Sequence, residues 1–131
     1  MRTVIQTLGQ SLAMSFDAAF VLPSLIVNAC AVPNQIVVKA TRFGIIRVLL
    51  CTRPRTHLPA IFTSGELLIE AENQTIGIPF SGISALQDAL TMMLDNPNTR
   101  VSKDAPFGVI EAFFHWPIAP IFEGKVFTIP I

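Results

Sequence analysis

The stretch GELLIEAENQTIGIPF, residues 65–80, carries the clearest structural signal in this chain. In its first half apolar side chains alternate with acidic ones, which is typical of a strand with one buried face and one wet face. Asn73 has the turn chemistry that reverses a chain, and apolar residues resume on one face after it. We therefore predict a β-hairpin whose first strand carries an acidic outer row, Glu66, Glu70 and Glu72.

The segment after this hairpin predicts an amphipathic helix over about 83–95. Its apolar residues recur every three or four positions, as they do on one face of an α-helix. Ser84 and Gln87 have the spacing of a capping box, and Asn96-Pro97 is expected to end the helix. The expected apolar face comprises Ile83, Leu86, Leu90, Met93 and Leu94.

Weaker signals on both sides complete the expected fold class. These patterns predict an α+β protein, an antiparallel β-sheet with one main amphipathic helix packed on it. The chain shows no evident repeat, low-complexity tract or linker, which predicts a single domain over 1–131. The other expected elements are a possible N-terminal helix over 3–20 and strands at 25–32, 35–41, 45–52, 107–116 and 125–131.

The composition predicts self-association. Hydrophobic residues make up 51% of the chain and charged residues only 14%, where soluble domains usually carry about 25% charged residues. So few charged side chains leave part of a monomer's surface apolar, and exposed apolar surface usually meets a partner. We therefore expect this chain to bind copies of itself.

Two further features concern the compartment. The uncharged stretch 18–38 is long enough to cross a bilayer, but Pro23 and Pro33 interrupt it, so we expect no membrane span. Cys30 and Cys51 both lie among apolar residues and are expected to be buried free thiols. This pattern favours a reducing compartment, either the cytoplasm or the interior of a particle.

The charges are distributed unevenly between the two halves of the chain. Residues 1–65 contain six Lys or Arg and one acidic residue, whereas residues 66–131 contain three and eight. The basic side chains could pair with the acidic row of the same molecule, meet the acidic face of a neighbouring subunit head to tail, or hold phosphates. The basic set comprises Lys39, Arg42, Arg47, Arg53 and Arg55.

The sequence offers no recognisable catalytic set. Its two histidines are His57 and His115, and no Cys-x-x-Cys or His-x-x-x-His spacing of a metal site is present. A Cys51 nucleophile would need a phosphate-binding loop of small residues, which the following TRPRT sequence does not supply. We expect a protein that is not an enzyme and that uses no cofactor and no metal.

The C-terminal stretch FFHWPIAPIFEGKVFTIPI, residues 113–131, is rich in aromatic residues and proline. Such stretches either close a core or contact another protein, and both alternatives stay open here. The residues assigned to a contact surface are Phe113, Phe114, Trp116 and Phe122.

These observations lead to two functional hypotheses. The first is a non-enzymatic, self-associating structural protein, for example a subunit of a viral or other particle, whose basic segment 39–57 meets the acidic segment 66–72. The alternative is an oligomeric protein that binds single-stranded nucleic acid through segment 39–57. A domain with an apolar ligand cavity is also compatible with the sequence.

Overall fold

The computed structural model describes residues 1–42, 44–52 and 65–115. They form eight strands, two α-helices and one turn of 3-10 helix. In chain order these are β1 (Arg2–Thr7), β2 (Gln10–Ser15), α1 (Ala18–Ala31), β3 (Val37–Thr41), β4 (Gly44–Cys51), β5 (Glu66–Ala71), β6 (Gln74–Pro79), η2 (Phe80–Gly82), α2 (Ile83–Asp95), β7 (Val101–Ala105) and β8 (Gly108–His115).

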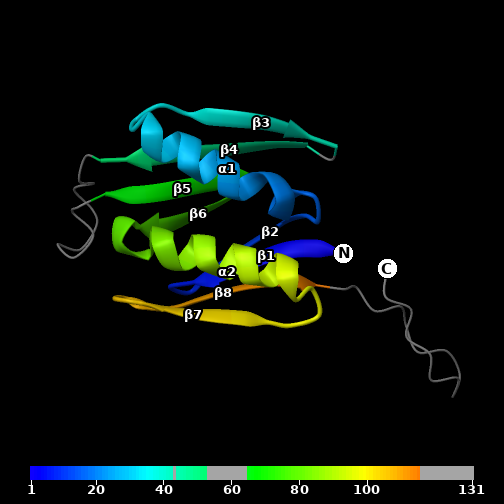
Figure 1. Ribbon diagram of the computed structural model, residues 1–131. Coiled ribbons are helices and arrows are strands. Elements are labelled where there is room, and N and C mark those ends of the chain that lie inside the picture. The colour runs from blue at the N-terminus through cyan, green and yellow to red at the C-terminus, as the bar shows by residue number, and fades with distance from the viewer. Residues whose placement is uncertain (43, 53–64, 116–131) are drawn as a thin grey trace, which may run out of the picture.

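The strands form two four-stranded antiparallel sheets. One sheet has the order β2-β1-β8-β7 and the other has the order β3-β4-β5-β6. Figure 1 shows both helices in front of the strands: α1 lies against β3 and β4, α2 lies against β7 and β8, and the two helices contact each other. The face of each sheet that points away from the helices is called the outer face below.

A single buried cluster fills the space between the helices and the sheets. Alternate residues of each inner strand point into it, which follows from the two-residue period of a strand. Each fully buried Leu or Ile side chain contributes about 1.5–3 kcal/mol through the apolar surface removed from water. The largest fully buried side chains include Ile5, Leu12, Met14, Leu22, Ile26, Leu67, Ile69, Ile76, Ile78, Leu86, Leu90 and Met93.

The order of elements reveals a tandem repeat. Strands β1 to β4 begin at residues 2, 10, 37 and 44, and strands β5 to β8 begin at 66, 74, 101 and 108, so every strand recurs 64 residues later with the same length. Each unit is a β-β-α-β-β arrangement, which we call repeat 1 (residues 2–51) and repeat 2 (residues 66–115). The expectation that the chain contains no repeat was therefore wrong.

The two repeats also align in sequence without any insertion or deletion. Eleven of the fifty aligned pairs are identical, and they include the glycine that opens β4 and β8 with a positive φ. The identical pairs are Ile5/Ile69, Gln10/Gln74, Phe16/Phe80, Leu22/Leu86, Pro33/Pro97, Asn34/Asn98, Val37/Val101, Lys39/Lys103, Phe43/Phe107, Gly44/Gly108 and Ile46/Ile110.

The repeats are interleaved rather than placed side by side. Each sheet takes two strands from each repeat, because β4 pairs with β5 and β1 pairs with β8. Exchanging the two repeats converts one strand order into the other, so the fold has an approximate internal two-fold symmetry. The two sheets adjoin where β2 contacts β6. Because β2 and β6 are equivalent strands of the two repeats, the approximate two-fold axis passes near this contact.

An identical glutamine in each repeat joins the two sheets. The Gln10 side chain donates to the Gly77 carbonyl and accepts from the Gly77 N–H, both at 2.9 Å, as a neighbouring strand would. The equivalent Gln74 accepts from the N–H of Ala13, the equivalent of Gly77, at 3.1 Å. These side chains bond to backbone groups at the edges of β2 and β6, and within the described residues neither strand has a second strand partner there.

The predicted hairpin over 65–80, the predicted helix over 83–95 and the α+β class are confirmed, with two sheets in place of one. The possible N-terminal helix over 3–20 was wrong, because most of that segment is the β1–β2 hairpin. Its turn is Leu8-Gly9, and both residues have positive φ, as the two-residue turn of a twisted hairpin requires.

Two other expectations also need correction. The segment 25–32, expected to be a strand, is the second half of α1 and its C-cap, Val32, and the strand β7 was missed. The capping box is absent: the N-cap of α2 is Gly82, which makes no side-chain cap bond, and Gln87 donates instead to the Pro23 carbonyl at 3.0 Å. The strand expected at 125–131 lies outside the described residues.

Candidate interaction surfaces

The three predicted basic side chains that the structure describes, Lys39, Arg42 and Arg47, do not form one cluster. Lys39 lies exposed on β3, and Arg42 lies exposed just after it, with its backbone N–H 3.4 Å from the Asp17 carboxylate. Arg47 projects from the outer face of β4. Arg53 and Arg55 lie outside the described residues.

The acidic row is engaged within the same chain. Arg47 Nη1 lies 2.9 Å from Glu70 Oε1 across the β4–β5 ladder, which is the within-chain alternative left open by the sequence. Glu72 Oε2 lies 2.8 Å from Arg2 Nη2, a partner that the sequence pattern did not predict. Glu66 is half-buried over Gly77, and a Cβ at that glycine would collide with the Glu66 carboxylate.

We expect the Arg47–Glu70 pair to contribute little to folding. About half of each side chain is exposed, so water and salt weaken the attraction. A double-mutant cycle with Arg47→Ala and Glu70→Ala, read by urea denaturation, should give a coupling energy of about 0.2–1 kcal/mol that falls in high salt. A coupling of several kcal/mol would mean that the pair is desolvated, for example by a bound neighbour.

The aromatic residues at the end of β8 have different surroundings. Phe113 lies half-buried on the outer face, and the Arg100 guanidinium lies 3.9 Å above its ring. Arg100 also bonds Glu111 Oε2 at 2.6 Å and Gln6 Oε1 at 3.1 Å. Phe114 points the other way and is buried in the core, so it does not belong to an exposed contact surface. Trp116 and Phe122 lie outside the described residues.

The outer face of the β3–β4 hairpin carries a group of exposed apolar side chains beside Arg47. Ile36, Val38 and Ile45 are 61%, 53% and 46% exposed, and Ala40 between them is also exposed. The register pairs Val38 with Arg47 and Ala40 with Ile45, which places them on one face. We call Ile36, Val38, Ala40 and Ile45 the β3 patch, which was not among the surfaces predicted from the sequence.

The internal repeat provides a direct comparison for the β3 patch. The equivalent positions in repeat 2 are Arg100, Ser102, Asp104 and Val109. The same backbone positions therefore carry mostly polar or charged side chains in repeat 2, and Arg100 there covers the aromatic ring below it. The fold does not require apolar residues at these positions, so the β3 patch needs another explanation.

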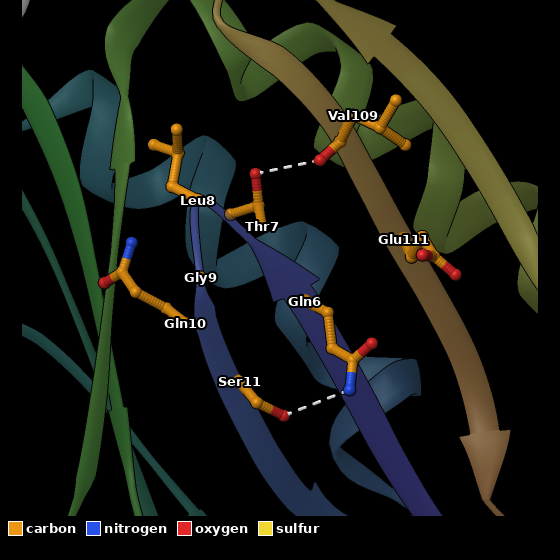
Figure 2. A pocket seen from close by; sticks show the side chains of 8 residues that line it. All are labelled: Gln6, Thr7, Leu8, Gly9, Gln10, Ser11, Val109 and Glu111. Atoms are coloured by element: carbon orange, nitrogen blue, oxygen red, sulfur yellow. Dashed lines mark hydrogen bonds between the residues drawn. The ribbon is translucent and has the colours of Figure 1, made fainter.

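An open pocket of about 380 Å³ lies at the β1–β2 turn, beside β8. Figure 2 shows Gln6 facing Ser11, at 3.5 Å between Nε2 and Oγ, and the Thr7 hydroxyl donating to the Val109 carbonyl at 3.1 Å. Glu111 is the single titratable side chain among its lining residues, and it is already paired with Arg100. This lining holds no pairing of a nucleophile with a base.

A second groove, of about 560 Å³, runs between α1 and α2. Its walls are Pro23, Ser24, Val27 and Asn28 on one side and Gln87 and Thr91 on the other, and none of them ionises. In the chain as described, no three His, Cys, Asp or Glu residues are grouped as metal ligands would be. These surroundings offer hydrogen bonds and apolar contact but no acid–base chemistry.

The two cysteines are free and half-buried. Burial raises the pKa of the Cys30 thiol, which disfavours the reactive thiolate.

Among the described helices, none is long and apolar enough to cross a membrane. A search of known protein families, of curated proteins and of solved structures found no match for this chain.

Proposed function

We propose that this chain is a non-enzymatic, self-associating structural protein and that the β3 patch is the surface through which two copies meet. The observation that carries the proposal is the difference between the repeats. Two apolar side chains, Ile36 and Val38, are more than half exposed where repeat 2 has Arg100 and Ser102. Burying exposed apolar side chains against a partner is favourable by about 25 cal/mol per Å².

The charged segments have a smaller role in this proposal than the sequence suggested. Glu70 and Glu72 already have arginine partners in their own chain, so a neighbouring subunit would have to compete with them. The same holds for the nucleic-acid alternative, since Arg47 would have to leave Glu70 to bind a phosphate. Self-association through apolar contacts leaves the Arg47–Glu70 and Arg2–Glu72 ion pairs in place.

The test is the mass of the protein in solution. The variant Ile36→Arg/Val38→Ser carries the residues that repeat 2 has at the equivalent positions, so we expect it to fold. We expect the native chain to sediment at twice its 14.3 kDa mass or a higher multiple, and the variant to sediment at 14.3 kDa. Val109→Ser, which changes an exposed apolar residue of repeat 2, is the matched control and should leave the native mass unchanged.

Sedimentation recorded at 260 and 280 nm separates the alternatives. A native chain that stays at 14.3 kDa at high micromolar concentration would contradict the proposal. Absorbance at 260 nm that sediments with the protein and is removed by salt would support nucleic-acid binding instead. Urea denaturation must also show that the double variant is folded, because an unfolded variant would sediment as a monomer for a reason unrelated to the β3 patch.

A further inference from the structure

The β3 strand has an unpaired edge next to the β3 patch. In the described part of the chain, β3 pairs with β4 alone and β7 pairs with β8 alone, so these two strands end the two sheets. An edge strand presents backbone N–H and C=O groups along its free side, which makes it a template for another strand. Because β3 and β7 are equivalent in the two repeats, they can be compared directly.

The free edges of β7 and β3 differ in the side chains that an incoming strand would meet. On its outer face β7 carries Ser102 and Asp104, and Arg100 precedes it, already bonded to Glu111 and Gln6. Charged side chains at an edge discourage strand addition. At the equivalent positions β3 presents Val38 and Ala40, with Ile36 before them. Both strands also carry a lysine on the other face, Lys39 and Lys103, so the difference between the two edges lies on the outer face. There β3 has no charged side chain, and it suits an incoming strand with apolar residues on the same face.

We infer that β3 pairs with β3 of a second copy, antiparallel and about a two-fold axis near Val38. The inference rests on the proposed function and specifies the geometry of that contact. A two-fold axis at Lys39 would place two lysines opposite each other, and like charges at directly opposite positions destabilise a sheet. An axis at Val38 places Val38 opposite its copy and Ile36 opposite Ala40, so the outer face of the seam is entirely apolar.

This geometry gives a closed dimer rather than a chain of subunits. An isologous contact uses the same surface on both partners and is complete after one copy has bound. The two β3-β4-β5-β6 sheets would join into one sheet of eight strands, with α1 of each copy on the same side. A head-to-tail contact between β3 and β7 would instead bury Ile36 and Val38 beside Arg100, Ser102 or Asp104, which are polar or charged.

Single cysteines placed along the edge strands test this register. In a Cys30→Ala/Cys51→Ser background, mild oxidation of Val38→Cys should yield a disulfide-linked dimer, because opposed residues across strands lie within disulfide range. Mixing Ile36→Cys with Ala40→Cys should also yield a linked dimer. The matched control is Ser102→Cys, the equivalent of Val38 in repeat 2, which should not link to itself or to Val38→Cys.

The outcomes of these experiments test the β3–β3 pairing separately from self-association itself. Linkage at Val38 and none at Ser102 supports the β3–β3 seam. Linkage of Val38→Cys to Ser102→Cys overturns it in favour of head-to-tail assembly. If the native chain sediments as a dimer but no β3 position links, the seam is wrong while self-association stands. If the native chain is a monomer, the proposed function itself fails.

Discussion

Replacing either Ile5 or Ile69 with alanine should lower the free energy of unfolding by about 2–5 kcal/mol. Ile5 and Ile69 are identical residues at equivalent positions, both are fully buried, and both lie on the central strands of their sheets. Ile5→Ala and Ile69→Ala each remove methylene groups from the same core and leave a cavity. A domain of ordinary stability, about 5–15 kcal/mol, would lose a large part of it.

Urea denaturation at a single protein concentration measures both changes. Val109→Ala, at an exposed position of β8, serves as the control and should change the free energy of unfolding by less than about 0.5 kcal/mol. Since the two isoleucines occupy symmetric places in one core, their costs should be similar. A large cost at Ile5 with almost none at Ile69 would contradict the shared core.

The second large effect is expected at Gln10. Its side chain satisfies both the N–H and the carbonyl of Gly77, which is buried. Gln10→Ala would leave two buried peptide groups without partners, and each such group costs about 1–3 kcal/mol. Gln10→Glu keeps the acceptor but cannot donate to the carbonyl when ionised, so its cost should be intermediate.

The matched control is the equivalent residue of the other repeat. Gln74 makes a single bond to the Ala13 N–H at an exposed position, where water can replace it, so Gln74→Ala should cost at most about 1 kcal/mol. Hydrogen exchange of the Gly77 amide gives a direct readout and should accelerate in Gln10→Ala. Unchanged protection of that amide would show that the glutamine is not its essential partner.

Some elements could be predicted from the sequence because their local patterns agree with their environment. The β5–β6 hairpin has one buried and one wet face on its first strand, and α2 has a single apolar stripe. Helix α1 lacks such a stripe: Phe20 and Val27 are apolar yet exposed, and Pro23 lies inside the helix. Its β-branched, proline-containing run therefore resembled a strand.

The candidate site was harder to predict, for a different reason. The Arg47–Glu70 pair joins neighbouring strands of one sheet and was among the alternatives. The Arg2–Glu72 pair instead joins β1 of one sheet to the turn after β5 of the other, so it depends on how the sheets adjoin. The β3 patch is conspicuous only by comparison with repeat 2. Eleven identities scattered over fifty positions are a weak repeat signal in the sequence, whereas the equal strand lengths at a spacing of 64 residues make the repeat plain.

The interleaving of the repeats constrains the order in which a growing chain can fold. Strand β1 leaves the ribosome well before β8, yet β8 is one of its two neighbours, with Gln6 opposite Glu111. Until synthesis has passed residue 115, β1 has one open side, and the nascent chain carries an edge that the finished protein covers. Such a delay favours slow folding and exposes newly made chains to aggregation, so production of this protein should depend strongly on temperature and on holding chaperones.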